Sequence, residues 1–435
     1  MVYKFSARTL VVALITAISL CLTGWVSSVR AESTEELKAQ LRAMQRQMMQ
    51  MQKNMQALQD RINQLEAQKV APAPAVEAGA VPSVWTKYNM KLYGKIKIDV
   101  NYDTAEFTRY NDFVGAVDTG DGHKNDSTNF NPRDTRFGFV ASHAITENWE
   151  GLGRFEIDFY GDNNVDNLIP RMRLAYVDLA NKKIGTSIRI GQDWIPVAQL
   201  NPSTVDFGIL TAAGNLWWRV PQITVRQKVG DIELLGSLMK HRRKSTTDED
   251  RMPWILARIA YTNGVLGEGN MIALGGGYRH GSYGTTDNTG TQYGEKNTDR
   301  WLICAEAKYG IGPVTIKGEL WTGEGIGRNF LRYDLDMTED GEAASAYGGW
   351  FDITYKVTDK NTVTVGYGFD NPNNTDIGDY ENARRFTRNE QYFVNTWYSL
   401  SKALQVGAEW IYIETERHDE INTGNRFSVS MKYLF

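Results

Sequence analysis

The sequence predicts an all-β fold, a 16-stranded antiparallel transmembrane β-barrel preceded by an N-terminal α-helical coiled coil. Three observations lead to this prediction. From about Tyr88 onward, apolar and polar residues alternate along successive segments, a period of two that is typical of strands with unlike faces. Short turns alternate with long polar connections, as they do between the two rims of a barrel. Mean hydropathy is −0.43, which excludes a polytopic helical membrane protein but is compatible with strands that alternate.

A secretory signal peptide is expected at the start of the chain. The apolar run 10–26 follows the basic residues Lys4 and Arg8, and small residues stand near Ala31. We therefore expect residues 1–31 to be the signal peptide. A permanent N-terminal anchor is the alternative.

The composition of the mature chain excludes some classes of function. Removal of residues 1–31 takes away three bases (Lys4, Arg8, Arg30) and no acid, so the formal net charge of −4 becomes −7. This balance gives no support to nucleic-acid binding. Cys21 leaves with the signal peptide, so Cys304 stands alone and no internal disulfide can form.

Residues 32–69 predict a helix that forms a coiled coil. Apolar residues recur at alternating steps of four and three, which is the seam of a left-handed coil, and the other positions are nearly all polar. Near the end of the seam, Arg61 and Glu66 flank it in an arrangement similar to a short motif of three-stranded coils, in which Arg pairs with Glu of a neighbouring helix. We therefore expect a homotrimer, with a dimer as the alternative. The expected trimerisation residues are Leu41, Met48, Met55, Arg61, Ile62, Leu65 and Glu66.

The barrel domain is expected at residues 88–435, after a Pro/Ala-rich linker at residues 70–87. The predicted strands are 91–102, 136–145, 152–161, 171–180, 186–194, 223–230, 232–241, 254–261, 271–280, 301–309, 314–321, 349–357, 362–369, 391–400, 404–415 and 425–435. Their number is even, so both ends of the barrel emerge on the same, periplasmic side. A soluble all-β protein is the alternative, but sandwiches do not usually alternate loop length so regularly.

The last predicted strand has the clearest alternation. Its residues Phe427, Val429, Met431, Tyr433 and Phe435 fall on every second position and share one face. This ending resembles the closing strand of bacterial outer-membrane barrels, in which a terminal Phe is read by the barrel assembly machinery. The resemblance implies that Phe435 is the barrel-assembly signal.

The order of signal, coil, linker and barrel resembles that of the trimeric outer-membrane porins, in particular the DcaP-like group. The barrel opens with KLYGKIKIDVNY, closes with KYLF and contains, in order, RDTRFGF, GRFEIDFYGD, RMRLAYVDL and IRIGQDW, which are similar to the early strands of that group. The resemblance implies a trimeric channel for small anionic solutes such as dicarboxylates. It also implies that the long connection 196–218 folds inward and narrows the pore.

In such a barrel the inward-facing charges carry function. Arginines exceed acids on the inner faces of adjacent early strands, and rings of Arg bias a pore toward anions. The alternative is that these arginines simply pair across strands with acids such as Glu156 and Asp158. The expected pore-lining residues are Arg136, Arg154, Arg171, Arg173, Arg189, Asp206 and Arg226.

Two further expectations concern the connection 196–218. Asp206 is its only charge, and opposite an arginine wall it would create a transverse field. Trp217 and Trp218 are expected to belong to the aromatic girdle at the membrane interface, and the alternative is that they restrict the lumen.

Motifs of catalysis and metal binding are missing from the sequence. The five His residues are scattered, and neither a Gly-x-Ser-x-Gly elbow nor a Gly-rich phosphate loop occurs. We therefore expect no catalytic residue, metal or cofactor. The expected location is the outer membrane with the coil in the periplasm. The expected partners are the lipid bilayer, lipopolysaccharide, two further copies of the chain, the barrel assembly machinery and small anionic solutes. Two alternatives remain, a structural barrel tethered to the periplasm or peptidoglycan by its coil, and a barrel hydrolase.

Overall fold

The computed structural model describes Met49, Lys53 and Gln56, and residues 89–107, 112–119, 125–162, 167–242, 252–286, 292–331, 337–338, 342–373, 386–417 and 420–435. The chain divides into two compact units, Met1–Val81 and Pro82–Phe435. The expected signal peptide, the linker and all seven expected trimerisation residues lie outside the described residues. Met49, Lys53 and Gln56, from the expected coil, are helical and exposed. Among the described residues, no helix is both long and apolar enough to cross a membrane.

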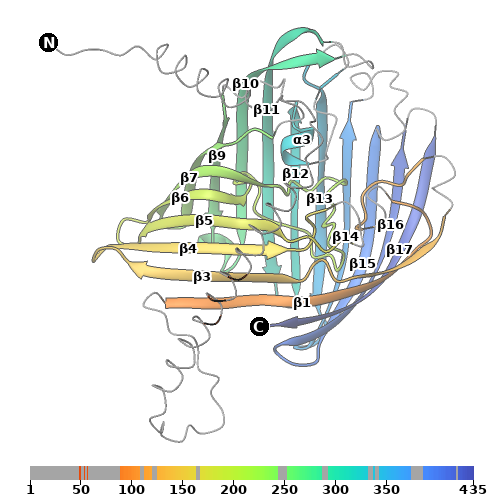
Figure 1. Ribbon diagram of the computed structural model, residues 1–435, viewed down its shortest axis with the longest axis horizontal. Helices are drawn as coiled ribbons and strands as arrows, with labels where there is room; N and C mark the ends of the chain where they lie inside the picture. Colours follow the sequence, from red (N-terminus) through yellow and green to blue (C-terminus); the bar gives the residue numbers. More distant parts are fainter. Residues whose placement is uncertain are drawn as a thin grey trace, which may run out of the picture. The chain divides into compact units, whose positions relative to one another are not determined.

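The second unit is one closed antiparallel sheet (Figure 1). Its strands are β1 (Asn89–Asp103), β2 (Ser127–Asn131), β3 (Arg136–Ala144), β4 (Trp149–Asp158), β5 (Arg171–Asn181), β6 (Thr186–Trp194), β7 (Arg219–Val229), β8 (Ile232–Met239), β9 (Trp254–Thr262), β10 (Met271–Thr286), β11 (Gln292–Ile311), β12 (Val314–Glu324), β13 (Ser345–Lys356), β14 (Asn361–Pro372), β15 (Arg388–Ser399), β16 (Leu404–Glu416) and β17 (Ile421–Leu434). Two short helices, η2 (Gly264–Leu266) and α3 (Gly327–Phe330), lie in connections.

The predicted 16-stranded barrel is confirmed, although one wall position is built from two strands. β2 pairs with residues 99–103 of β1, and β3 pairs with residues 89–95 of the same strand. The two therefore follow each other along β1 and count as one strand of the wall. β17 pairs with the other edge of β1 and closes the barrel, so the C-terminus lies beside β1 (Figure 1). All sixteen segments predicted from the alternation are strands.

The two faces of the wall differ as the alternation predicts. On β17, Phe427 and Val429 point outward and are 48% and 63% exposed, whereas Arg426 and Ser428 point inward and are buried. The outward apolar face is suited to lipid, and the inward polar face to a wet interior. Phe435 extends this strand, and its backbone exchanges hydrogen bonds of 3.0 and 3.2 Å with Gly94 of β1.

Two connections fold into the barrel. The first is residues 195–218 between β6 and β7, which we call the lumen loop. In Figure 1 it crosses the inside of the sheet toward β13 and β14. The second is the connection between β1 and β2, in which residues 112–117 are buried.

Both connections pack into apolar clusters against the wall. One cluster joins Ile195, Val197, Leu216, Trp217 and Trp218 of the lumen loop to inward residues of β7 to β13 and to Phe330 of α3. The other joins Leu210 of the lumen loop and Val114 to inward residues of β13, β15 and β16. Burial of apolar surface away from water stabilises these connections inside the barrel. Trp217 and Trp218 are only 2% and 9% exposed, so the expectation that they lie in the interfacial girdle is wrong.

Candidate functional site

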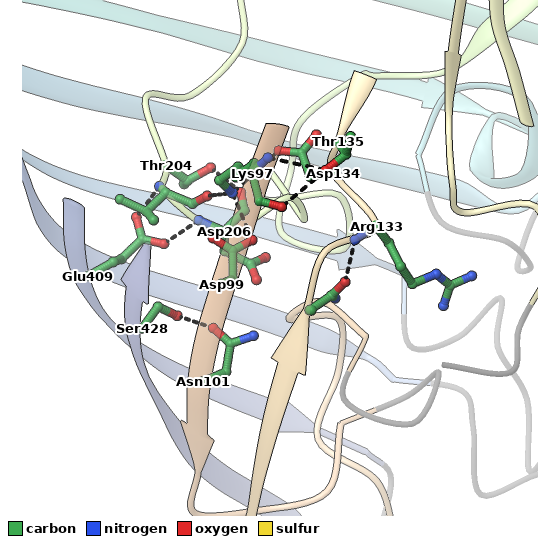
Figure 2. Close-up of polar contacts among 12 residues, drawn as sticks. Lys97, Asp99, Asn101, Arg133, Asp134, Thr135, Thr204, Asp206, Glu409 and Ser428 are labelled. Atoms are coloured by element: carbon green, nitrogen blue, oxygen red, sulfur yellow. Dashed lines mark hydrogen bonds and ion pairs between the residues drawn. The ribbon is translucent and has the colours of Figure 1, made fainter. Parts of the chain in front are cut away.

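Wall carboxylates hold the lumen loop in place. Glu409 of β16 accepts hydrogen bonds of 2.7 Å from the backbone N–H groups of Val205 and Asp206 (Figure 2). Glu306 of β11 accepts two more from the loop, of 2.6 and 2.7 Å. Buried N–H groups without a sheet partner are costly, and these carboxylates satisfy them. Two further wall carboxylates act in the same way: Glu319 accepts from Leu216 N and Asp352 from Ser203 N.

Wall cations complete the anchor and contact the middle of the lumen loop. The carboxylate of Asp206 accepts a hydrogen bond of 2.8 Å from Arg426 of β17, which also pairs with Asp103 of β1. Lys97 of β1 donates to the carbonyl of Val205 at 2.7 Å (Figure 2). Asp206 and Asp103 therefore share the positive charge of Arg426. The transverse field expected between Asp206 and the arginines stays a prediction.

The six arginines expected to line the pore all point into the barrel, and each pairs with a carboxylate. Arg173 of β5 bridges Glu156 and Asp158 of β4 at 2.7 and 2.8 Å. The alternative of cross-strand pairing therefore holds for these two acids. The other pairs are Arg136 with Asp134 (2.9 Å), Arg154 with Glu156 (3.4 Å), Arg171 with Asp158 (2.7 Å), Arg189 with Asp178 and Asp193, and Arg226 with Asp193 (4.0 Å).

In most of these pairs the arginine is more exposed than its carboxylate. The side chains of five arginines are 18–34% exposed, with Arg226 at the lower limit and Arg154 at the upper limit. The carboxylates that they pair with are at most 10% exposed. Arg173 is the exception, because its side chain is 1% exposed. Water in the lumen therefore meets the guanidinium groups, and the acids lie behind them.

A cavity of about 130 Å³ lies between the lumen loop and the wall, and we call it the inner cavity. Three of the expected pore residues line it, namely Arg136, Arg173 and Asp206. Arg154, Arg171, Arg189 and Arg226 do not. The remaining charged residues that line it are Lys95, Lys97, Asp134, Arg219 and Lys432, and the aromatic ones are Trp194, Phe207, Trp217 and Trp397.

The charged residues of the inner cavity include several that the sequence analysis did not single out. Lys95, Lys97 and Lys432 stand on the polar faces of the first and last strands, so the alternation already placed them inside. What it could not supply was the register that brings β1 and β17 side by side, with Lys97 directly opposite Lys432. Arg219 follows the lumen loop directly, and no periodic pattern points to it. Among the described residues, no group of His, Cys, Asp and Glu side chains is arranged to hold a metal ion.

Comparison with known proteins agrees with this architecture. The model of the Gram-negative porin family matches residues 70–418. No curated protein matches the sequence. Among solved structures, the outer membrane channel DcaP of Acinetobacter baumannii is similar at 21% identity and a TM-score of 0.68, over 84% of this chain and 100% of that one.

Two other solved structures from different bacteria are also similar. The anion-selective porin from Comamonas acidovorans has 14% identity and a TM-score of 0.57, over 80% of this chain and 100% of that one. OmpF of Salmonella typhi has 14% identity and a TM-score of 0.54, over 80% and 97%. At these identities the likeness shows the fold, while the family model covers most of the chain. The chain belongs to the Gram-negative porin family, and its barrel is an outer-membrane channel.

Proposed function

We propose that this porin lets small hydrophilic solutes diffuse across the outer membrane and prefers anions. The observation that supports the preference is the unequal exposure of the arginine–carboxylate pairs on β3 to β7. Guanidinium groups face the lumen and their carboxylates are buried behind them. A solute in the lumen therefore approaches the positive end of each pair first, and lining charges of one sign raise the local concentration of the opposite ion. The similarity to a porin described as anion-selective agrees with this proposal.

The preference is expected to be moderate. A lone charge 4 Å away contributes about 1 kcal/mol in water and about 4 kcal/mol at the effective dielectric of a protein surface. Each arginine here has a carboxylate beside it, which removes much of that potential. A net effect of about 1 kcal/mol corresponds to roughly a five-fold preference for anions over cations.

Reversal potentials in planar bilayers under a gradient of potassium chloride test the proposal. The reversal potential of the wild-type channel is expected to have the sign of an anion-preferring pore. Raising the ionic strength should weaken the preference, because salt screens charges at a water-filled surface. A reversal potential of the opposite sign would reject the anion preference.

We propose further that residues 32–69 form a periplasmic coil that holds three barrels together. The support is the sequence seam that ends at Arg61 and Glu66. Deletion of 32–69 is then expected to abolish trimers while each barrel still conducts. The tether alternative predicts the reverse, with intact trimers and blebbing of the outer membrane. Blue native electrophoresis together with electron microscopy of the deletion strain distinguishes the two.

A further inference from the structure

Two cations of the inner cavity differ from all the others that line it. Among the described residues, neither Arg219 nor Lys432 has a carboxylate within ion-pair distance. Lys95, Lys97 and Arg136 share Asp134, at 2.6, 3.3 and 2.9 Å. Arg173, the remaining cation of the cavity, is bound to Glu156 and Asp158. We propose that Arg219 and Lys432 form an anion-binding subsite that takes a carboxylate or another small oxyanion.

Indole rings make cation–π contacts with both cations and do not neutralise their charge. The guanidinium carbon of Arg219 lies 4.7 Å from the ring centre of Trp194 and 5.7 Å from that of Trp217. The ammonium nitrogen of Lys432 lies 3.7 Å from the ring centre of Trp397. A cation–π contact stabilises a positive charge by about 0.5–2 kcal/mol and leaves that charge in place. Both side chains are half-buried, so their N–H donors are available to a ligand.

The backbone register provides a second, independent argument that Lys432 binds an anion. Lys432 stands directly opposite Lys97 across the β1–β17 ladder. Like charges in this position repel each other. Lys97 is compensated by Asp99 at 2.8 Å and by Asp134, and Lys432 is not. An anion bound at Lys432 removes this repulsion, so the site favours an anionic occupant.

The cavity has room for one anionic group. Its volume of about 130 Å³ is several times the roughly 10–15 Å³ that admits a single water. An oxyanion can therefore enter by displacing water, and the rest of a larger solute extends into the lumen. Charge-assisted hydrogen bonds from a guanidinium and an ammonium would replace those of the displaced water. Because Arg219 begins β7 and Lys432 lies on β17, the subsite exists only in the closed barrel.

This inference rests on the proposed anion preference and names the residues that bind the anion. Conductance is measured in planar bilayers with increasing potassium acetate, for wild type and for the Arg219→Gln and Lys432→Gln variants. In the wild type we expect conductance to saturate as the subsite fills. Each substitution is expected to raise the half-saturating acetate concentration about tenfold, the factor that corresponds to 1.4 kcal/mol.

Three variants serve as controls. Lys182→Gln removes the same charge from a side chain that is 82% exposed in the turn between β5 and β6, and it should behave as wild type. Arg219→Lys and Lys432→Arg keep the charge and are expected to retain saturation. Should Arg219→Gln fail to assemble, Lys432→Gln decides the question.

The outcomes separate the two proposals. A wild type that prefers anions, with unchanged saturation in both glutamine variants, overturns the subsite and leaves the anion preference standing. A wild type without anion preference overturns both. Loss of saturation in Lys182→Gln as well shows a general effect of net charge and also overturns the subsite.

Discussion

Substitution of Glu409 by alanine is expected to loosen the lumen loop and change the current through the channel. The two carboxylate oxygens of Glu409 accept hydrogen bonds from Val205 N and Asp206 N at 2.7 Å each. Alanine leaves both backbone donors buried without an acceptor. Since an unsatisfied buried donor costs about 1–3 kcal/mol, the present loop conformation loses about 2–6 kcal/mol.

This cost is local, because the barrel itself does not depend on Glu409. The backbone of β16 stays paired with β15 and β17 along its whole length. The ends of the lumen loop also keep their bonds to Glu306 and Glu319. We therefore expect the middle of the loop, near Val205, to leave the wall while the barrel assembles normally.

Single-channel recording in planar bilayers measures the effect. Glu409→Ala is expected to show excess open-channel noise and an altered conductance, and Glu409→Gln about half of the change, because an amide keeps one acceptor oxygen. The matched control is Glu414→Ala, five residues further along β16, whose carboxylate accepts from Tyr412 Oη at 3.2 Å, away from the lumen loop. Noise and conductance equal to wild type in an assembled Glu409→Ala channel would refute the reasoning.

Three other perturbations have definite expected outcomes. Arg154→Gln removes the most exposed of the six arginines expected to line the pore and leaves Glu156 bound to Arg173. The anion-to-cation permeability ratio should therefore fall about two-fold, and an unchanged reversal potential contradicts this. Burial, and then the nearby arginines, lowers the pKa of His241, which follows β8, to about 2 from its ordinary value of 6.5. The neutral form of His241 is therefore favoured in the folded state, and the stability of the protein falls as pH drops below about 6.5. His241→Gln should remove about 2 kcal/mol of the difference in stability between pH 7.5 and pH 5. Denaturant unfolding at the two pH values measures this difference. Gly214→Ala places a Cβ 2.3 Å from two wall carbonyls at a φ of +94°, so it should lower the melting temperature, whereas Gly236→Ala, with open space around its Cβ, should not.

The fold was predictable wherever one face of a strand meets lipid. The predicted strand 186–194 coincides with β6, in which Ile188 and Ile190 alternate with Ser187 and Arg189. The short strand β2 was missed, since STNFN is polar and too short to show a period. Residues 281–286 of β10 and 292–300 of β11 were missed for a related reason. Gly and polar residues dominate there, so these parts of the two strands show no alternation.

The site was less predictable, because it depends on contacts between distant parts of the chain. That arginines face the lumen follows from the alternation, but which carboxylates lie behind them depends on register. The burial of Trp217 is fixed by Phe330 and Leu331, more than a hundred residues away. Likewise, no local pattern distinguishes Lys432, which lacks an acid, from Lys97, which has two.

The apolar clusters inside the barrel have a consequence for how this protein can diverge. Where these clusters pack against β8 to β16 the interior resembles the core of a soluble domain, and enlarging or truncating one of their side chains should cost stability as it does in such a core. Along β1 to β6 and β17 the interior is charged and wet, and exchanges there alter which solutes pass more than whether the chain folds. Selection for a new solute can therefore act on one side of the cylinder while the other side preserves the architecture.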